Sequence, residues 1–140
     1  MSVKFFLDTN ILVYAVDQTN PQKHAIAREW LTLAHESGAG VISYQVVQEW
    51  LNTVLRKPAV RIGVEGAEEH YRTLLEPLWR IDSSRAIVQT ALDLFRHNSF
   101  SWWDSMIVGA AIEANCSVLL SEDLQHGREI MGLRIENPFQ

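Results

Sequence analysis

Short apolar runs alternate with stretches of helical periodicity along the chain, and this alternation constrains the fold more than any other feature of the sequence. The runs that have the length and composition of strands are 3–7, 41–42, 79–81, 118–120 and, as a last short strand, 133–135. Strands that alternate with helices favour a mostly parallel sheet covered by those helices. We therefore predict an α/β domain with a sheet of about four or five strands and ligand sites beyond their carboxyl ends.

Capping residues and apolar periodicity indicate where the helices lie. We expect a polar turn after the first strand, and the most loop-like interior stretch at 56–66, where Pro58 and two glycines occur. The predicted helices run from Asn20-Pro21 to about Glu36, from Ser43 to before Pro58, from about Val64 to Glu76, from a cap at Asp82 or Ser83 through Phe95, and from about Trp102 to Ala114.

Size and composition indicate one globular unit. The chain has 140 residues, of which 47% are hydrophobic and 21% charged, so we predict a single domain over residues 1–140. Its apolar stretches are shorter than the roughly 18 residues that cross a bilayer, and its start lacks the features of a signal peptide. We expect a cytoplasmic protein without a membrane partner. Cys116 has no disulfide partner and is predicted to be a small buried apolar residue.

Four acidic residues from distant parts of the chain lie where a cation site is commonly built. Asp8 and Asp123 follow apolar strands, Asp104 opens a predicted helix, and Glu49 lies within another. Carboxylates gathered at such positions hold hard cations such as Mg2+ against a phosphate. After the strand at 118–120, strand alternation does not decide whether Glu122 or Asp123 points inward.

Each of these acids also has an ordinary structural interpretation. Asp8 can be a helix cap or turn residue, and Asp104 fits a capping box. Glu49 lies on the polar face of its helix, where it either faces solvent or borders a cleft together with Asn52 and Thr53. Spacing alone is therefore weak support for a metal site.

The net charge of -5 argues against binding of nucleic acid by a general excess of Lys and Arg. A nucleic-acid partner must be bound locally, and the compact basic group is Arg56, Lys57 and Arg61. These cations either contact phosphates or stabilise the end of the preceding helix. The five histidines lack a zinc-like spacing, and no constellation of a metal-independent ribonuclease is found. Most of the five tryptophans are predicted to be core or subunit-interface residues.

Four segments occur in an order and context found in one nuclease family. They are Leu7-Asp8-Thr9-Asn10-Ile11-Leu12, Ser43-Tyr44-Gln45-Val46-Val47-Gln48-Glu49, Ser101-Trp102-Trp103-Asp104-Ser105 and Leu120-Ser121-Glu122-Asp123-Leu124-Gln125-His126-Gly127. With these segments the chain resembles PIN-domain ribonucleases over nearly its whole length, and it is most similar to the VapC-type toxins of bacterial toxin–antitoxin pairs. The resemblance implies a PIN-like fold with three layers, α/β/α.

The resemblance also implies which residues form the site. The catalytic acids, which would hold one or two Mg2+ ions or Mn2+ in their place, are Asp8, Glu49, Asp104 and Asp123. Thr9, Asn10 and Ser121 would support these acids, Glu122 would lie at the rim, and Trp103 would pack rather than stack on a base. A cation held in this way promotes attack of water on a phosphodiester, so hydrolysis is expected to leave a 5′-phosphate and a 3′-hydroxyl.

By the same resemblance, the protein is expected to be an endoribonuclease toxin that cleaves RNA, is neutralised by a cognate antitoxin and forms a homodimer. Three alternatives belong to other classes. A catalytically silent PIN fold would only bind another protein. A Mg2+-binding receiver domain requires adjacent acids after the first strand and a late Lys, and a haloacid-dehalogenase-like phosphatase requires Asp where Asn10 stands.

Overall fold

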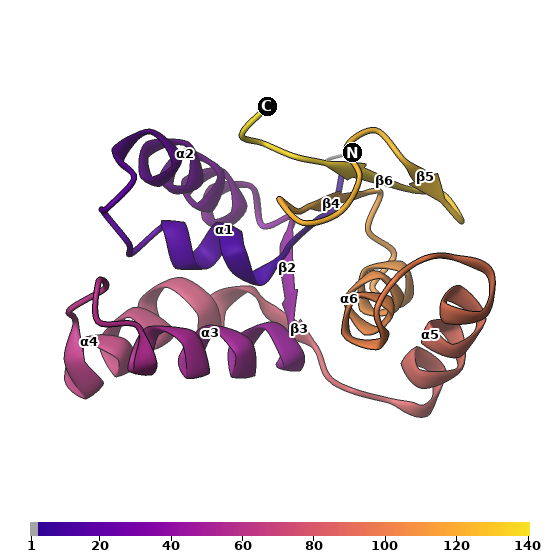
Figure 1. Cartoon of the computed structure of the whole chain (residues 1–140), viewed down its shortest axis with the longest axis horizontal. Coiled ribbons are helices and arrows are strands. Elements are labelled where there is room, and N and C mark those ends of the chain that lie inside the picture. The colour runs from indigo at the N-terminus through magenta and orange to yellow at the C-terminus, as the bar shows by residue number, and fades with distance from the viewer. Residues whose placement is uncertain (1–2) are drawn as a thin grey trace.

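The computed structural model describes residues 3–140, and its centre is a sheet with the strand order β3-β2-β1-β4-β6-β5 (Figure 1). Neighbouring strands run parallel except β5 and β6, which are antiparallel. The strands are β1 (Phe5–Leu7), β2 (Gly40–Ser43), β3 (Trp79–Ile81), β4 (Val118–Leu120), β5 (Glu129–Ile130) and β6 (Leu133–Glu136). The mostly parallel α/β sheet is confirmed. The structure adds β5, whose two residues are too few to carry an alternation pattern.

Helices cover both faces of this sheet. Figure 1 shows α1 to α4 on one side of the strands and α5 and α6 on the other, which is the predicted three-layer arrangement. The helices are α1 (Thr9–Tyr14), α2 (Pro21–Ser37), α3 (Tyr44–Arg56), α4 (Gly63–His70), α5 (Arg85–His97) and α6 (Trp102–Glu113). A π-helical turn (Tyr71–Leu75) and a 3₁₀ turn (Glu76–Leu78) extend α4 toward β3.

Side-chain caps begin the helices much as the sequence predicts. Asn20, Ser43 and Ser101 accept hydrogen bonds from backbone N–H groups of α2, α3 and α6, and α2 ends at Gly38 in the left-handed conformation with φ 69°. The predicted cap of α5 is wrong, because Ser84 accepts the N–H of Ile87 in place of Asp82 or Ser83.

The polar turn predicted after β1 is also wrong, because α1 begins there directly at Thr9. The helix has only six residues, and Ile11, Leu12 and Val13 are all buried. A helix covered on most of its circumference shows no apolar periodicity, so the sequence pattern does not reveal it. This short helix places Thr9 and Asn10 of the first motif directly after Asp8, at the same cavity.

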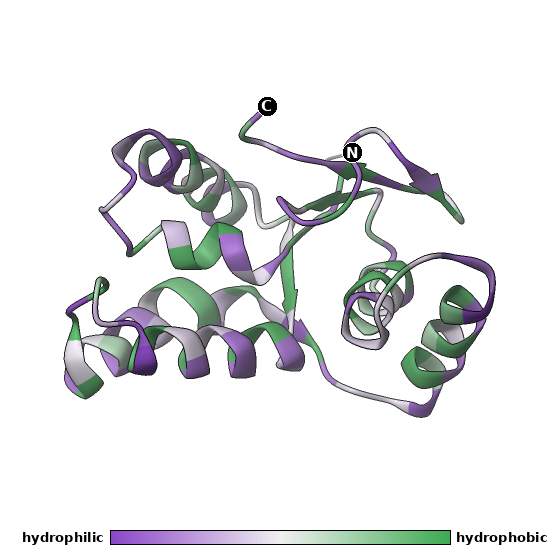
Figure 2. Ribbon diagram, in the orientation of Figure 1, coloured by the Kyte–Doolittle hydropathy of each residue, from purple (hydrophilic) through white to green (hydrophobic). Residues whose placement is uncertain are grey.

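The core lies between the sheet and both helical layers. The central strand β2 is apolar in Figure 2, whereas β5 at the edge is largely hydrophilic. In β1 and β4, Phe6, Leu7, Leu119 and Leu120 are fully buried. Cys116 is buried, as predicted. On α5, Ile87, Ala91 and Leu94 face the core, whereas the exposed apolar side chains are Val88 (39%), Leu92 (42%) and Phe95 (49%). Within residues 3–140, no helix is long and apolar enough to cross a membrane.

Trp50 joins α3, which carries Glu49, to α1, which Asp8 caps. Its side chain is fully buried in α3, and its indole Nε1 donates a 3.0 Å hydrogen bond to the carbonyl oxygen of Leu12 in α1. Because this carbonyl lies near the end of a short helix, the bond also satisfies a backbone acceptor that α1 leaves free. Trp50 therefore holds Glu49 in register with the start of α1.

Replacing Trp50 with Phe should destabilise the fold. The change leaves the Leu12 carbonyl without its donor and opens a void in the core, which together cost about 2–4 kcal/mol in the free energy of unfolding. The matched control is Trp103→Phe, because Trp103 is 63% exposed and its truncation should change stability by less than about 0.5 kcal/mol. Urea denaturation followed by circular dichroism measures both; equal effects would contradict the proposed role of Trp50.

Candidate active site

The four predicted acids come together at the carboxyl ends of β1 and β4. Asp8 follows β1 and Asp123 lies three residues after β4, the parallel neighbour of β1. Glu49 projects from α3 and Asp104 from the first turn of α6. A cavity of about 270 Å³ is lined by Asp8, Thr9, Asn10, Glu49, Asn52, Thr53, Asp104, Ile107 and Asp123. The structure thus places all four acids around one cavity.

Asp8 is the most enclosed of the four. It is only 6% exposed and it caps α1, where its Oδ1 accepts the N–H of Thr9 at 2.7 Å. Its Oδ2 accepts the hydroxyl of Ser121 at 2.8 Å. The capping interpretation is therefore confirmed for Asp8, and the same carboxylate that follows β1 and begins α1 also lines the cavity.

Burial dominates the titration of Asp8. Loss of solvent raises its pKa from 3.8 to about 7, although the hydrogen bonds from Ser121 and Thr9 lower it. The charges of Glu49 and Asp123 raise the pKa further. A carboxyl group beside other carboxylates in a poorly solvated cavity gains from any positive charge placed among them.

Glu49 borders the cleft rather than bulk solvent. Its Oε1 accepts the hydroxyl of Thr9 at 2.6 Å, and its Oε2 accepts the side-chain amide of Gln45 at 3.2 Å. Asn52 and Thr53, on the same stripe of α3, line the same cavity. The apolar face of α3 points to the core, so its polar face is left for the site.

Asp104 lies in the first turn of α6, half-buried at the cavity. Its backbone N–H bonds to the Ser101 hydroxyl at 3.1 Å, which is the predicted cap. Gln45 also donates to the backbone carbonyl of Trp103 at 3.2 Å and so connects α3 with α6.

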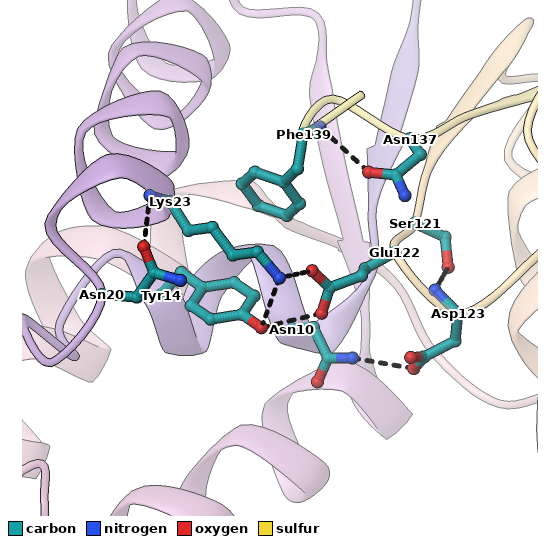
Figure 3. Close-up of polar contacts among 9 residues, drawn as sticks. All are labelled: Asn10, Tyr14, Asn20, Lys23, Ser121, Glu122, Asp123, Asn137 and Phe139. Atoms are coloured by element: carbon teal, nitrogen blue, oxygen red, sulfur yellow. Dashed lines mark hydrogen bonds and ion pairs between the residues drawn. The ribbon is translucent and has the colours of Figure 1, made fainter.

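The structure separates the neighbouring acids Glu122 and Asp123. Asp123 lines the cavity, where its Oδ2 accepts the side-chain amide of Asn10 at 2.7 Å and its N–H bonds to the Ser121 hydroxyl at 3.2 Å. Figure 3 shows Glu122 turned the other way, toward Tyr14 and Lys23. Of the two acids between which the sequence does not decide, Asp123 is the one that lines the cavity.

A cluster of three elements holds Glu122 away from the cavity. Its carboxylate accepts the Tyr14 hydroxyl at 2.7 Å and forms an ion pair with Lys23 (Figure 3). The Lys23 ammonium also lies 5.1 Å from the ring centre of Tyr14 and 5.5 Å from that of Phe139. Burial raises the pKa of Glu122, but the hydrogen bonds from Lys23 and Tyr14 outweigh it and leave the pKa below its ordinary value.

Asp123 shifts in the opposite direction. Burial raises its pKa, the charges of Asp104 and Glu122 raise it further, and the hydrogen bond from Asn10 lowers it. Asn10 and Tyr14 are one helical turn apart on α1, so adjacent residues of the loop after β4 are held by one stripe of that helix. No sequence signal reveals this cluster, because Lys23 and Glu122 are 99 positions apart.

One further prediction needs correction. Trp103 is 63% exposed and does not pack in the core; its position in the first turn of α6 turns the ring outward. In the basic group 56–61, Lys57 is paired, because its ammonium bonds to Asp17 at 2.8 Å. Trp50 is buried as predicted, and Trp30, Trp79 and Trp102 are half-buried.

The oxygen atoms that line the cavity are of the kind that bind a hard divalent cation. Four carboxylates line the cavity, and oxygen is the ligand atom that Mg2+ and Mn2+ prefer. In the described residues 3–140, no three His, Cys, Asp or Glu side chains are close enough together to hold a metal ion as they stand. Hydrogen bonds from Thr9 and Asn10 hold Glu49 and Asp123, so these two acids must exchange such bonds to bind an ion.

The PIN-domain family model matches residues 5–128, and the chain therefore belongs to the PIN-domain family. A DNA-bound VapBC complex from Salmonella typhimurium has 20% identity and a TM-score of 0.68, with 98% of this chain and 99% of that chain covered. VapC20 of Mycobacterium tuberculosis, a toxin that cleaves the sarcin–ricin loop, has 17% identity and a TM-score of 0.64, with 86% and 90% covered.

FitAcB from Neisseria gonorrhoeae has 16% identity and a TM-score of 0.65, with 96% of this chain and 98% of that chain covered. At these identities the similarity shows a shared fold. A search of curated proteins finds no match of significant similarity.

Replacing Asp8 with Asn should stabilise the metal-free protein above neutral pH. The pKa of Asp8 rises on folding from 3.8 to about 7, so the folded protein binds the proton more tightly than the unfolded chain. Wild-type stability therefore falls as pH rises through this window, and the variant escapes that loss. We expect the variant to gain up to about 4 kcal/mol at pH 8 in EDTA and almost nothing near pH 4.

Urea denaturation at a series of pH values measures this difference. The control is Asp93→Asn, an exposed acid of α5, which should show no comparable pH dependence. A gain for Asp8→Asn that is larger at pH 4 than at pH 8 would contradict a raised pKa.

Proposed function

We propose that this protein is a Mg2+-dependent endoribonuclease and the toxin of a toxin–antitoxin pair. The observation that carries the proposal is the convergence of Asp8, Glu49, Asp104 and Asp123 on one cavity from four separate elements. Membership of the PIN-domain family supports a nuclease. The similarity to VapC20, which cleaves the sarcin–ricin loop, supports RNA as the substrate.

In this proposal the four acids hold one or two Mg2+ ions, with Mn2+ as a substitute. When bound, the ion supplies activation of water and stabilisation of charge on the scissile phosphate, so that cleavage leaves a 5′-phosphate and a 3′-hydroxyl. Neighbouring side chains fix the positions of the carboxylates that would hold the ion. Ser121 and Thr9 orient Asp8, Asn10 orients Asp123, and Gln45 orients Glu49. Such preorganisation reduces the rearrangement required during reaction.

A cognate antitoxin and a second copy of the chain are the protein partners of the proposed toxin, which would act in the cytoplasm. Similar solved structures include a toxin–antitoxin complex from Klebsiella pneumoniae, which supports the antitoxin. The exposed apolar side chains of α5, which are Val88, Leu92 and Phe95, offer a surface that a second copy can cover and so support the homodimer.

Cleavage of labelled total RNA tests the proposal. Wild type should cleave with Mg2+ or Mn2+ and stop when EDTA is added, and new 5′ ends should accept no label from a kinase until phosphatase removes their phosphate. Asp8→Asn and Asp104→Asn should lose at least about 100-fold in rate, since each removes a proposed ligand. Asp93→Asn, an exposed change of equal charge, should retain the wild-type rate.

Other outcomes have definite meanings. Equal cleavage in Mg2+ and EDTA would contradict the metal mechanism. A wild-type protein that is inert toward RNA but binds the protein encoded beside it would favour the catalytically silent interaction module.

A further inference from the structure

The largest cavity of the described residues lies outside the acidic site. It has a volume of about 760 Å³ and is enclosed by the segment after α1, by α2, by residues 59–62 and by α4. Its charged and titratable lining residues are His24, Arg28, Arg61 and His70. No Asp or Glu of residues 3–140 lines it, although acids outnumber Lys and Arg by 17 to 12 in the chain.

The two arginines are free to bind an external anion. Among residues 3–140, neither Arg28 nor Arg61 forms an ion pair with a carboxylate. Arg28 is anchored by a 3.4 Å hydrogen bond from its Nη1 to the carbonyl oxygen of Ala15, which leaves its other donors available. An anchored guanidinium loses less conformational freedom when it binds an oxyanion.

Asp17, which lies between the lining residues Val16 and Gln18 in the chain, is paired with a cation of its own. Asp17 is only 1% exposed, bonds to the Lys57 ammonium at 2.8 Å and accepts the hydroxyl of Thr19 at 2.7 Å. The hydrogen bond from Lys57 holds the pKa of Asp17 at about 2. Asp17 and Lys57 thus form a neutral pair that does not line the cavity, and Asp17 forms no ion pair with either arginine.

The two histidines present one ring nitrogen each to a ligand. Nδ1 of His24 lies 2.8 Å from the carbonyl oxygen of Tyr14, and Nδ1 of His70 lies 2.8 Å from that of Gly66. A carbonyl oxygen only accepts, so Nδ1 carries the hydrogen in both rings. Nε2 of each ring is the atom left for an incoming group, and it donates when the ring is protonated.

The cavity lies at a distance from the acidic site that an RNA strand can span. The acidic site is at the start of α1, and the cavity begins at Ala15, directly after its end. The helix rises about 1.5 Å per residue, so about 10 Å separate the two positions along α1. This distance equals about three rises of roughly 3.4 Å between stacked nucleotides.

We propose that this cavity binds a backbone phosphate of the RNA substrate, about three nucleotides from the bond that is cut. The inference rests on the proposed ribonuclease function. It explains how a protein with a net charge of -5 can bind a negatively charged RNA strand. Arg28 and Arg61 neutralise the phosphate, while His24 and His70 bound the pocket that receives it. The acidic cleft itself repels the strand when no cation is bound, so an attractive site is needed beside it.

Binding of a fluorescein-labelled oligouridylate of twelve nucleotides, measured by anisotropy in EDTA, tests the site without cleavage. Arg28→Ala and Arg61→Ala should each raise the Kd roughly tenfold, because each removes a charge-assisted hydrogen bond. The double variant should also reduce the slope of log K against log salt by about 0.7 for the lost phosphate contact. Arg85→Ala, an exposed arginine of α5 on the other side of the sheet, should bind as wild type does.

Cleavage assays of the same proteins separate this inference from the proposed function. If both hold, the two cavity variants raise KM and leave kcat near the wild-type value. Mg2+-dependent cleavage together with unchanged Kd and KM in both variants would overturn the phosphate site and leave the nuclease intact. Cavity-dependent RNA binding without any cleavage would remove the nuclease proposal and retain the binding site. Variants that lose only binding of an antitoxin peptide would show that the cavity serves a protein, which also overturns the inference.

Discussion

The buried carboxylate of Asp8 is the contact on which the site depends. One of its oxygens accepts the N–H of Thr9 and so begins α1, while the other accepts the hydroxyl of Ser121 after β4. These bonds connect two parallel strands at their carboxyl ends and direct the segment that carries Asp123. Burial raises the pKa of Asp8 to about 7, so the fold holds an acid whose charge is costly unless a cation accompanies it. Asp8 therefore both connects two strands of the fold and is a ligand of the proposed metal site.

Residues of α1 also separate the two consecutive acids Glu122 and Asp123. Asn10 binds Asp123 on the side of the cleft, and Tyr14 with Lys23 binds Glu122 on the opposite side. Two consecutive acids thus acquire pKa shifts of opposite sign, although they have the same local sequence environment. Beyond the end of the same helix lies a cavity with cations and without acids. The helix α1 thus lies between a cavity lined by carboxylates and a cavity lined by arginines and histidines.

Much of the fold was predictable from particular residues. Asn20, Ser43 and Ser101 cap helices because a short polar side chain before an apolar face satisfies N–H groups locally. The missed elements, α1 and β5, are a short helix buried around most of its surface and a strand of two residues, and neither carries a period. Motif order brought Asp8, Glu49, Asp104 and Asp123 into one proposed site. Periodicity alone left Glu49 between solvent and cleft.

The sequence by itself determined the parallel α/β class and most helix starts, because each depends on neighbours within a few positions. The four acids were proposed from the order of the family motifs along the chain. Only the tertiary structure decided that Asp123 and not Glu122 enters the cleft, that Lys57 is neutralised by Asp17, and that Arg28 meets Arg61 across a cavity. These outcomes depend on pairs far apart in the chain. Their energies come from burial and from opposite charges brought within a few ångströms, which no local pattern records.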